Sequence, residues 1–120
     1  MSVVVAWALF ILGIAHIVFG LVRFKAPVAE AVAAGFIGQF KVPEARRTAF
    51  WFLMCGPLLM LAGQIAIHAV AVSDLSLLKV IGAYMFVVSV VGVTAFPKSP
   101  LWAPLVLSPM FVAAGYGLLP

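Results

Sequence analysis

The amino-acid sequence predicts an all-α fold, a four-transmembrane-helix bundle with a short interfacial helix between the first and second spans. Hydrophobic residues make up 67% of the chain and charged residues only 8%, whereas a soluble domain carries about a quarter charged residues. Four apolar stretches are each close to the ~20 residues that a helix needs to cross a bilayer. They are Val3–Val22, Thr48–Val72, Leu75–Phe96 and Pro100–Leu119. None has a periodic polar face along its length, which disfavours a soluble bundle, and residues 1–120 are expected to form a single domain.

The first stretch begins directly after Met1 and Ser2, without the basic segment that precedes the apolar core of a signal peptide. No small-residue cleavage site is followed by a polar segment that would begin a mature protein. We therefore expect a retained membrane helix.

The connection from Phe24 to Arg47 is too polar and too interrupted to cross the bilayer. Proline is tolerated in a first helical turn, as at Pro27, and Gly35 is expected to end that helix. We expect a short helix at the membrane interface, followed by aromatic and aliphatic side chains that face lipid or the bundle. Connections of this length are often functional, so a lid over a cavity is the alternative to a purely structural helix.

The helix of the second span is expected to begin before its apolar part, because Pro43 and Glu44 suit a first helical turn. Arg47 and Trp51 are four residues apart, so the guanidinium is expected to lie over the indole at the headgroup level.

The cations predict the orientation of the chain. Six of the seven lie in the connections after the first and third spans, and only Lys79 lies on the other side. These six are Arg23, Lys25, Lys41, Arg46, Arg47 and Lys98. Because cytoplasmic loops collect Lys and Arg, we expect an integral protein of the inner (cytoplasmic) membrane with both termini extracytoplasmic. Trp51 and Trp102, at the starts of their spans, suit anchors on the same inner face.

The same charge distribution excludes two classes of function. The net charge of +4 is accounted for by cations that flank apolar spans and contact membrane lipid, so no nucleic-acid partner is expected. A six-to-one bias argues against a dual-topology multidrug exporter, which needs a weak bias so that both orientations insert. The chain also lacks the membrane-embedded glutamate that such exporters use.

His16 is the most informative polar residue inside a predicted span, because polar groups there tend to face the bundle or a cavity. Gly13, His16, Gly20 and Arg23 share one helix face, and the glycines allow a backbone or a flat ligand to approach closely. Three readings remain open. His16 could donate to a backbone carbonyl of a neighbouring helix, contact a ligand or transfer a proton, or act as an axial haem ligand.

The other polar residues of the spans are few. Gln64 is expected to form an interhelical hydrogen bond, with a substrate contact as the alternative, and His68 is expected to be solvated. The two share a face, but a zinc site needs three or four ligands and no third ligand joins them, so no metal site is predicted. Tyr84 could pair with His16 as acid and base across the bundle.

Each predicted span carries two small residues seven positions apart, which places a narrow stripe on one face and favours tight helix packing. The pairs are Gly13/Gly20, Gly56/Gly63, Gly82/Ser89 and Ser108/Gly115. The pattern indicates a compact core without a water-filled pore. So short a chain leaves other helix faces free, which makes a homo-oligomer the expectation.

Three segments, Gly13–Gly20, Arg47–Gly56 and Pro97–Trp102, resemble an uncharacterised family of small four-helix bacterial integral membrane proteins. This resemblance implies fold and location and no activity. A weaker similarity is to the four-helix membrane-bound haem isomerases that rearrange epoxides. It lies in the long first loop leading through proline into the second helix and in Gly56-Pro57, with Met54 at the position where their haem histidine would be sought.

Three functions follow as hypotheses. The first is a protein that binds an apolar small molecule or lipid within the bundle, with His16, Gly13, Gly20, Arg23, Gln64 and Trp51 as ligand contacts. The second is a membrane-embedded isomerase acting on an apolar substrate, either through His16 and Tyr84 or through haem held by His16. The third is a small-molecule transporter, which the absence of embedded Asp or Glu disfavours.

Overall fold

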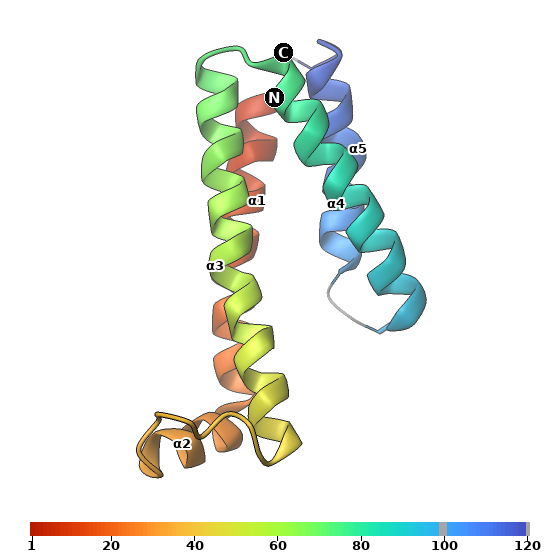
Figure 1. The fold of residues 1–120 in the computed structure, drawn as a ribbon. Coiled ribbons are helices and arrows are strands. Elements are labelled where there is room, and N and C mark those ends of the chain that lie inside the picture. Colours follow the sequence, from red (N-terminus) through yellow and green to blue (C-terminus); the bar gives the residue numbers. More distant parts are fainter. Residues whose placement is uncertain (99–100, 120) are drawn as a thin grey trace.

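The computed structural model describes residues 1–98 and 101–119, and all regular structure in those ranges is helical, which confirms the all-α prediction. The helices are α1 Ser2–Arg23, α2 Lys25–Ala33, α3 Glu44–Ala71, α4 Leu75–Ala95 and α5 Trp102–Gly115. α1 packs along α3, and α4 packs along α5 (Figure 1). The two pairs meet at the end that holds both chain termini and spread apart toward the other end, where α2 lies across the base of α1 and α3 (Figure 1).

Within the described residues, three helices, α1, α3 and α4, are long and apolar enough to cross a membrane. The fourth predicted span is shorter than expected, because α5 has 14 residues, or about 21 Å at 1.5 Å per residue, against a hydrocarbon core of ~30 Å. Pro100, its expected start, lies outside the described residues. Gly117 ends the helix with a φ of 74°, and the Leu118 amide donates to the Ala113 carbonyl at 2.9 Å, as in a Schellman motif.

Two prolines fix the ends of the helices next to the first connection. Pro27 has no amide to donate to the carbonyl of Arg23, and its ring would clash with that carbonyl in a continuous helix. α1 therefore ends at Arg23, and α2 starts in a new direction at Lys25. Pro43 precedes the first helical residue of α3, Glu44, as expected from the sequence.

All eight small residues of the predicted stripes are buried, which confirms that they lie at helix contacts. A methyl group built on Gly63 would clash with the amide nitrogen of Phe10 in α1, so these two backbones approach closely. On the other pair, a methyl group on Gly82 would lie 2.9 Å from the amide nitrogen of Val112 in α5. The stripes thus build two tight helix pairs, α1 with α3 and α4 with α5.

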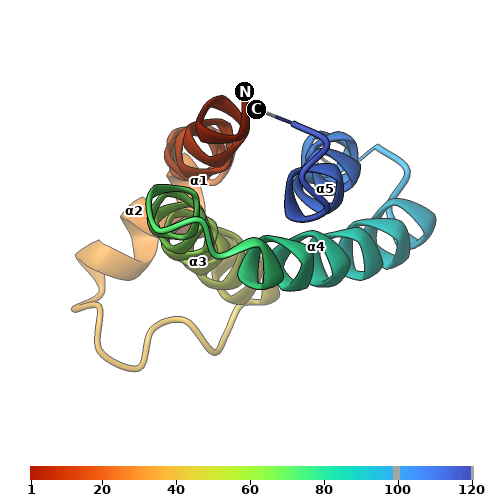
Figure 2. The same ribbon diagram turned by 90° about the horizontal axis from the view of Figure 1, so that it is seen from above.

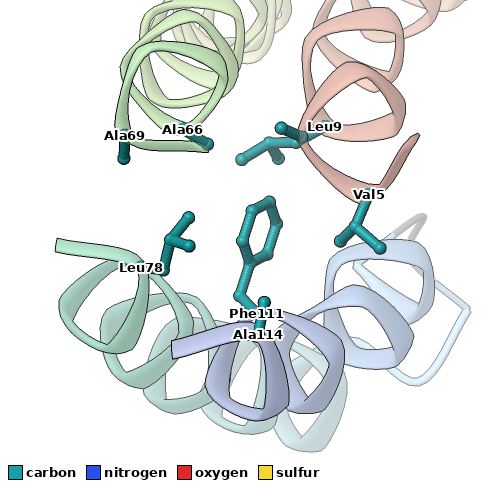
Figure 3. Close-up of a cluster of buried hydrophobic side chains, with 8 residues drawn as sticks. Val5, Leu9, Ala66, Ala69, Leu78, Phe111 and Ala114 are labelled. Carbon is teal, nitrogen blue, oxygen red and sulfur yellow. The ribbon is translucent and has the colours of Figure 1, made fainter. Parts of the chain in front are cut away.

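The two pairs are joined by one small apolar cluster near the termini, centred on Phe111 (Figure 3). The Phe111 ring projects from α5 toward Leu9 of α1, with Leu78 of α4 and Ala66 of α3 around it (Figure 3). No Cα atom of α1 lies within 8 Å of a Cα atom of α4. Viewed along the helices, the two pairs lie side by side and the connection between α2 and α3 loops outward (Figure 2). The two helix pairs are therefore joined mainly at one end of the molecule.

Candidate functional site

His16 lies on α1 and contacts α3 through both its ring nitrogen and its ring face. Nε2 is 2.8 Å from the backbone carbonyl oxygen of Phe52, and the imidazole stacks on the Phe52 ring with centroids 4.0 Å apart and planes 17° apart. Because a carbonyl only accepts, Nε2 must carry the hydrogen and donate it. Of the three readings open from the sequence, this geometry fits the donation to a backbone carbonyl of a neighbouring helix.

Tyr84 does not meet His16. Tyr84 lies on α4 and is 73% exposed, and no Cα atom of α4 lies within 8 Å of a Cα atom of α1. A proton cannot pass directly between two groups beyond hydrogen-bond reach. The pair predicted as acid and base is therefore not assembled in this structure.

The other predicted ligand contacts on the helices divide between packing and exposed surface. Gly13 and Gly20 are buried, and added methyl groups would meet Met60 and Leu53 of α3 at 2.6 Å in each case. Both glycines are thus used for helix packing. The Arg23 guanidinium lies 5.6 Å from the centroid of the Phe24 ring. Gln64 is exposed on α3.

Trp51, the remaining predicted contact, borders a groove formed by the α2–α3 connection and the first turns of α3. The groove has a volume of about 730 Å³ and is open on one side. It is lined by Phe36, Ile37, Gly38, Phe40, Lys41, Val42, Arg47, Phe50 and Trp51. A neighbouring hollow of about 550 Å³ shares Arg47 and Trp51 and extends along α3 to Cys55.

A chain of aromatic contacts holds the groove together. Phe36 packs edge-on against Phe40 with ring centroids 5.2 Å apart, Phe40 lies 5.5 Å from Phe50, and Phe50 lies 5.2 Å from Trp51. These distances fall within the range in which aromatic rings attract one another. Side chains of the connection are thereby tied to those of α3.

The backbone of the connection is turned by residues with positive φ. Gly35 has a φ of 111° and Phe36 a φ of 69°, and the Phe36 amide donates to the Ala31 carbonyl at 2.9 Å. This is the Schellman ending of α2, and it confirms that Gly35 stops the helix. The turn leaves Phe36 and Ile37 mostly exposed at the groove.

Arg46 ties the connection to α3 with hydrogen bonds and an ion pair. Its Nη1 lies 3.4 Å from Oε1 and 3.5 Å from the carbonyl oxygen of Gln39, and its Nη2 lies 3.9 Å from a carboxylate oxygen of Glu30 in α2. The side chain of Arg46 is only 16% exposed. It joins α2, the connection and α3 at one point.

The two cations of the groove differ from Arg46. Lys41 and Arg47 are exposed, and no ion pair joins either to a carboxylate within residues 1–98 and 101–119. The expected stacking of Arg47 on Trp51 is not among the cation–ring contacts of the described chain. The groove therefore offers two unpaired positive charges next to an aromatic surface.

No group of three or more His, Cys, Asp or Glu side chains that could hold a metal ion occurs in the described residues. The surroundings of His16 also do not fit haem, because Nε2 bonds to the Phe52 carbonyl and one ring face is covered by Phe52. Met54, at the position suggested by the haem isomerases, is exposed on α3.

Sequence reasoning identified Trp51 but did not assign the other lining residues as ligand contacts. A signal was present, because Phe36, Phe40 and Phe50 flank Lys41 and Arg47 in the long connection and the turns after it. Spacing alone could not show that residues 36–42 fold back beside residues 47–51.

A family model described as a family of unknown function, DUF6463, matches residues 1–116. The chain belongs to this family, which agrees with its resemblance to an uncharacterised family. No curated protein and no solved structure matches the chain, so the resemblance to haem isomerases has no support from these comparisons.

Proposed function

We propose that this member of the DUF6463 family is an integral membrane protein that binds a lipid or similar apolar molecule in the groove between the α2–α3 connection and α3. The observation that carries the proposal is the exposed aromatic lining beside the first turns of a helix long enough to cross a membrane. Binding sites for small molecules are concave and mostly apolar, with a few polar groups that fix orientation. This groove has that composition.

Three helices that could cross a membrane support the membrane assignment. α3 has 28 residues, about 42 Å at 1.5 Å per residue, which exceeds the ~30 Å hydrocarbon core. Its first turns would then project into the headgroup region, where Trp side chains and cations are favoured. The groove lies beside those turns.

The inner-membrane orientation with extracytoplasmic termini is part of this proposal. α2 lies at the end of the molecule opposite both termini, and the C-terminal end of α4 also points away from the termini (Figure 1). Six of the seven cations follow α1 or α4 in the sequence, five of them between Arg23 and Arg47 and the sixth at Lys98. The positive-inside rule then places the α2 end in the cytoplasm. Homo-oligomerisation remains a prediction.

The groove replaces the interior of the bundle as the proposed ligand site. Side chains of α3 fill the space beside the glycines that flank His16. The Phe111 ring occupies the junction of the two helix pairs (Figure 3). An isomerase using His16 and Tyr84 has no support from the arrangement of α1 and α4.

The test is titration of the detergent-solubilised protein with phosphatidylcholine, followed by native mass spectrometry. Phe36→Ser removes the ring of a 56%-exposed residue of the groove, and Phe86→Ser removes the ring of a 49%-exposed residue of α4, outside the groove. We expect saturable binding that Phe36→Ser weakens several-fold and Phe86→Ser leaves unchanged. Equal effects of the two variants would show that lipid adheres to the apolar surface in general and would overturn the proposal.

A further inference from the structure

We infer that the groove selects an anionic glycerophospholipid, with the phosphate held between Lys41 and Arg47 and the acyl chains on the aromatic lining. This inference rests on the proposed function and adds the chemical class of the ligand. Its basis is the sign and the distribution of charge around the groove.

The lining contains two cations and no carboxylate. In the first connection the acids are Glu30 and Glu44, and neither lines the groove. Glu30 pairs instead with Arg46 at 3.9 Å. Charge complementarity thus favours a negative occupant, since a cationic molecule would meet two like charges and a neutral one would leave both without a partner.

Arg46 and Arg47 are neighbours in the sequence, but of the two only Arg46 has a bonded partner among the described residues. Arg46 is largely buried and bonds to Gln39 and Glu30, so it is used within the fold. Arg47 is exposed at the junction of the groove and the hollow that reaches Cys55. A guanidinium presents a planar fork of donors that matches two phosphate oxygens, and an ammonium adds a compact charge.

The apolar part of the lining suits acyl chains. Phe36, Ile37, Phe50 and Trp51 supply exposed or half-exposed apolar surface next to the two cations. The second hollow continues from Arg47 and Trp51 along α3 toward the apolar part of that helix. A molecule with an anionic head group and long acyl chains matches this arrangement, in which two cations lie next to a continuous apolar surface.

The experiment compares phosphatidylglycerol with phosphatidylcholine, two phospholipids that differ in net charge, by native mass spectrometry of the full chain. We expect phosphatidylglycerol to bind about tenfold more tightly, and the preference to shrink at high ionic strength because salt screens exposed charges. Lys41→Gln with Arg47→Gln is expected to remove the preference. Lys25→Gln with Lys98→Gln, which deletes the same charge from exposed positions outside the groove, is expected to retain it.

The outcomes separate the two proposals. Equal binding of both lipids, with both still weakened by Phe36→Ser, would overturn the anionic selectivity and leave lipid binding in the groove standing. Loss of the preference in both charge variants would also overturn it, since net charge alone would then explain the effect.

Inorganic phosphate that competes as well as the lipid would identify a site for a free anion, and self-association abolished by Phe36→Ser would identify a second copy as the occupant. Either result would overturn the inference.

Discussion

The imidazole Nε2 of His16 donates to the backbone carbonyl of Phe52 at 2.8 Å, and the two rings stack on each other. This contact joins α1 to α3 through a polar group inside the apolar pair. Pro57 follows five residues after Phe52, and its missing amide leaves the carbonyl of Leu53, the next residue along, without its helical donor. The His16 imidazole thus adds a hydrogen-bond donor to α3 at Phe52, one residue from the carbonyl that Pro57 leaves without a helical donor.

Replacing His16 separates a packing role from a ligand role. His16→Phe keeps an aromatic ring on Phe52 and removes the donor, so we expect a loss of about 1 kcal/mol in stability, the usual net worth of one hydrogen bond. Lipid affinity at the groove should stay within twofold of wild type, because His16 does not line it. Thermal unfolding in detergent and lipid titration measure the two effects. A large loss of affinity in a folded His16→Phe protein would restore the ligand role.

Gly63→Ala tests the close approach of α1 and α3. The added methyl group would clash with the backbone nitrogen of Phe10, so the helices must move apart, at a cost of about 1–3 kcal/mol. Gly92→Ala is the matched control, because its methyl group meets the end of the Leu101 side chain, which can rotate. We expect the control to remain within about 1 kcal/mol of wild type, as measured by thermal unfolding. Equal destabilisation by both changes would contradict the backbone contact.

Ser108 and Pro109 are predicted to be energetically coupled. Pro109 cannot donate to the carbonyl of Leu105, and the buried Ser108 hydroxyl donates to that oxygen at 3.0 Å. Ser108→Ala should therefore cost about 1–3 kcal/mol, since it leaves the partly buried Leu105 carbonyl without this donor.

In a Pro109→Ala background the restored amide can serve the Leu105 carbonyl, so Ser108→Ala should cost less there. A double-mutant cycle of thermal stabilities measures the coupling, which we expect to be about 1 kcal/mol. Additive effects would mean that the hydroxyl does not replace the missing amide.

Arg46→Gln is predicted to loosen the groove more than Glu30→Gln does. Arg46 is largely buried and bonds to both Gln39 and Glu30, whereas the Glu30 side chain is 61% exposed, and exposed ion pairs contribute little. We expect faster hydrogen exchange at the amides of residues 36–42 in Arg46→Gln and little change in Glu30→Gln. The reverse order would show that the ion pair, and not the bonds to Gln39, holds the connection.

The proposed orientation predicts which positions can be labelled from outside the cell. In a Cys55→Ser background, Leu118→Cys should react with a membrane-impermeant maleimide on intact cells. Lys25→Cys and Lys98→Cys should react only after permeabilisation, because both are placed on the cytoplasmic side. Different accessibility of positions 25 and 98 would contradict a fold with both connections on one side of the membrane.

The sequence by itself determined the helices and much of their packing surface. Long apolar runs, prolines at first turns, Gly35 at the end of α2 and paired small residues are local signals, since each acts through the backbone or along one helix face. Their predictions hold for α1, α2, α3 and α4 in the structure. The fourth predicted span is longer than the helix that forms there, because the turn at Gly117 ends α5 before the apolar stretch ends.

Tertiary structure alone decided which polar groups meet. Helical spacing places His16 on one face of α1. The packing of α1 against α3 then brings its ring to the Phe52 carbonyl, and the separation of α1 from α4 keeps it away from Tyr84. The same is true of the groove, whose lining comes from residues 36–42 and 47–51. Those segments meet because the turn after α2 folds the chain back and Arg46 fastens it to α3. Such contacts depend on the path of the chain in space, which residue spacing along one helix does not specify.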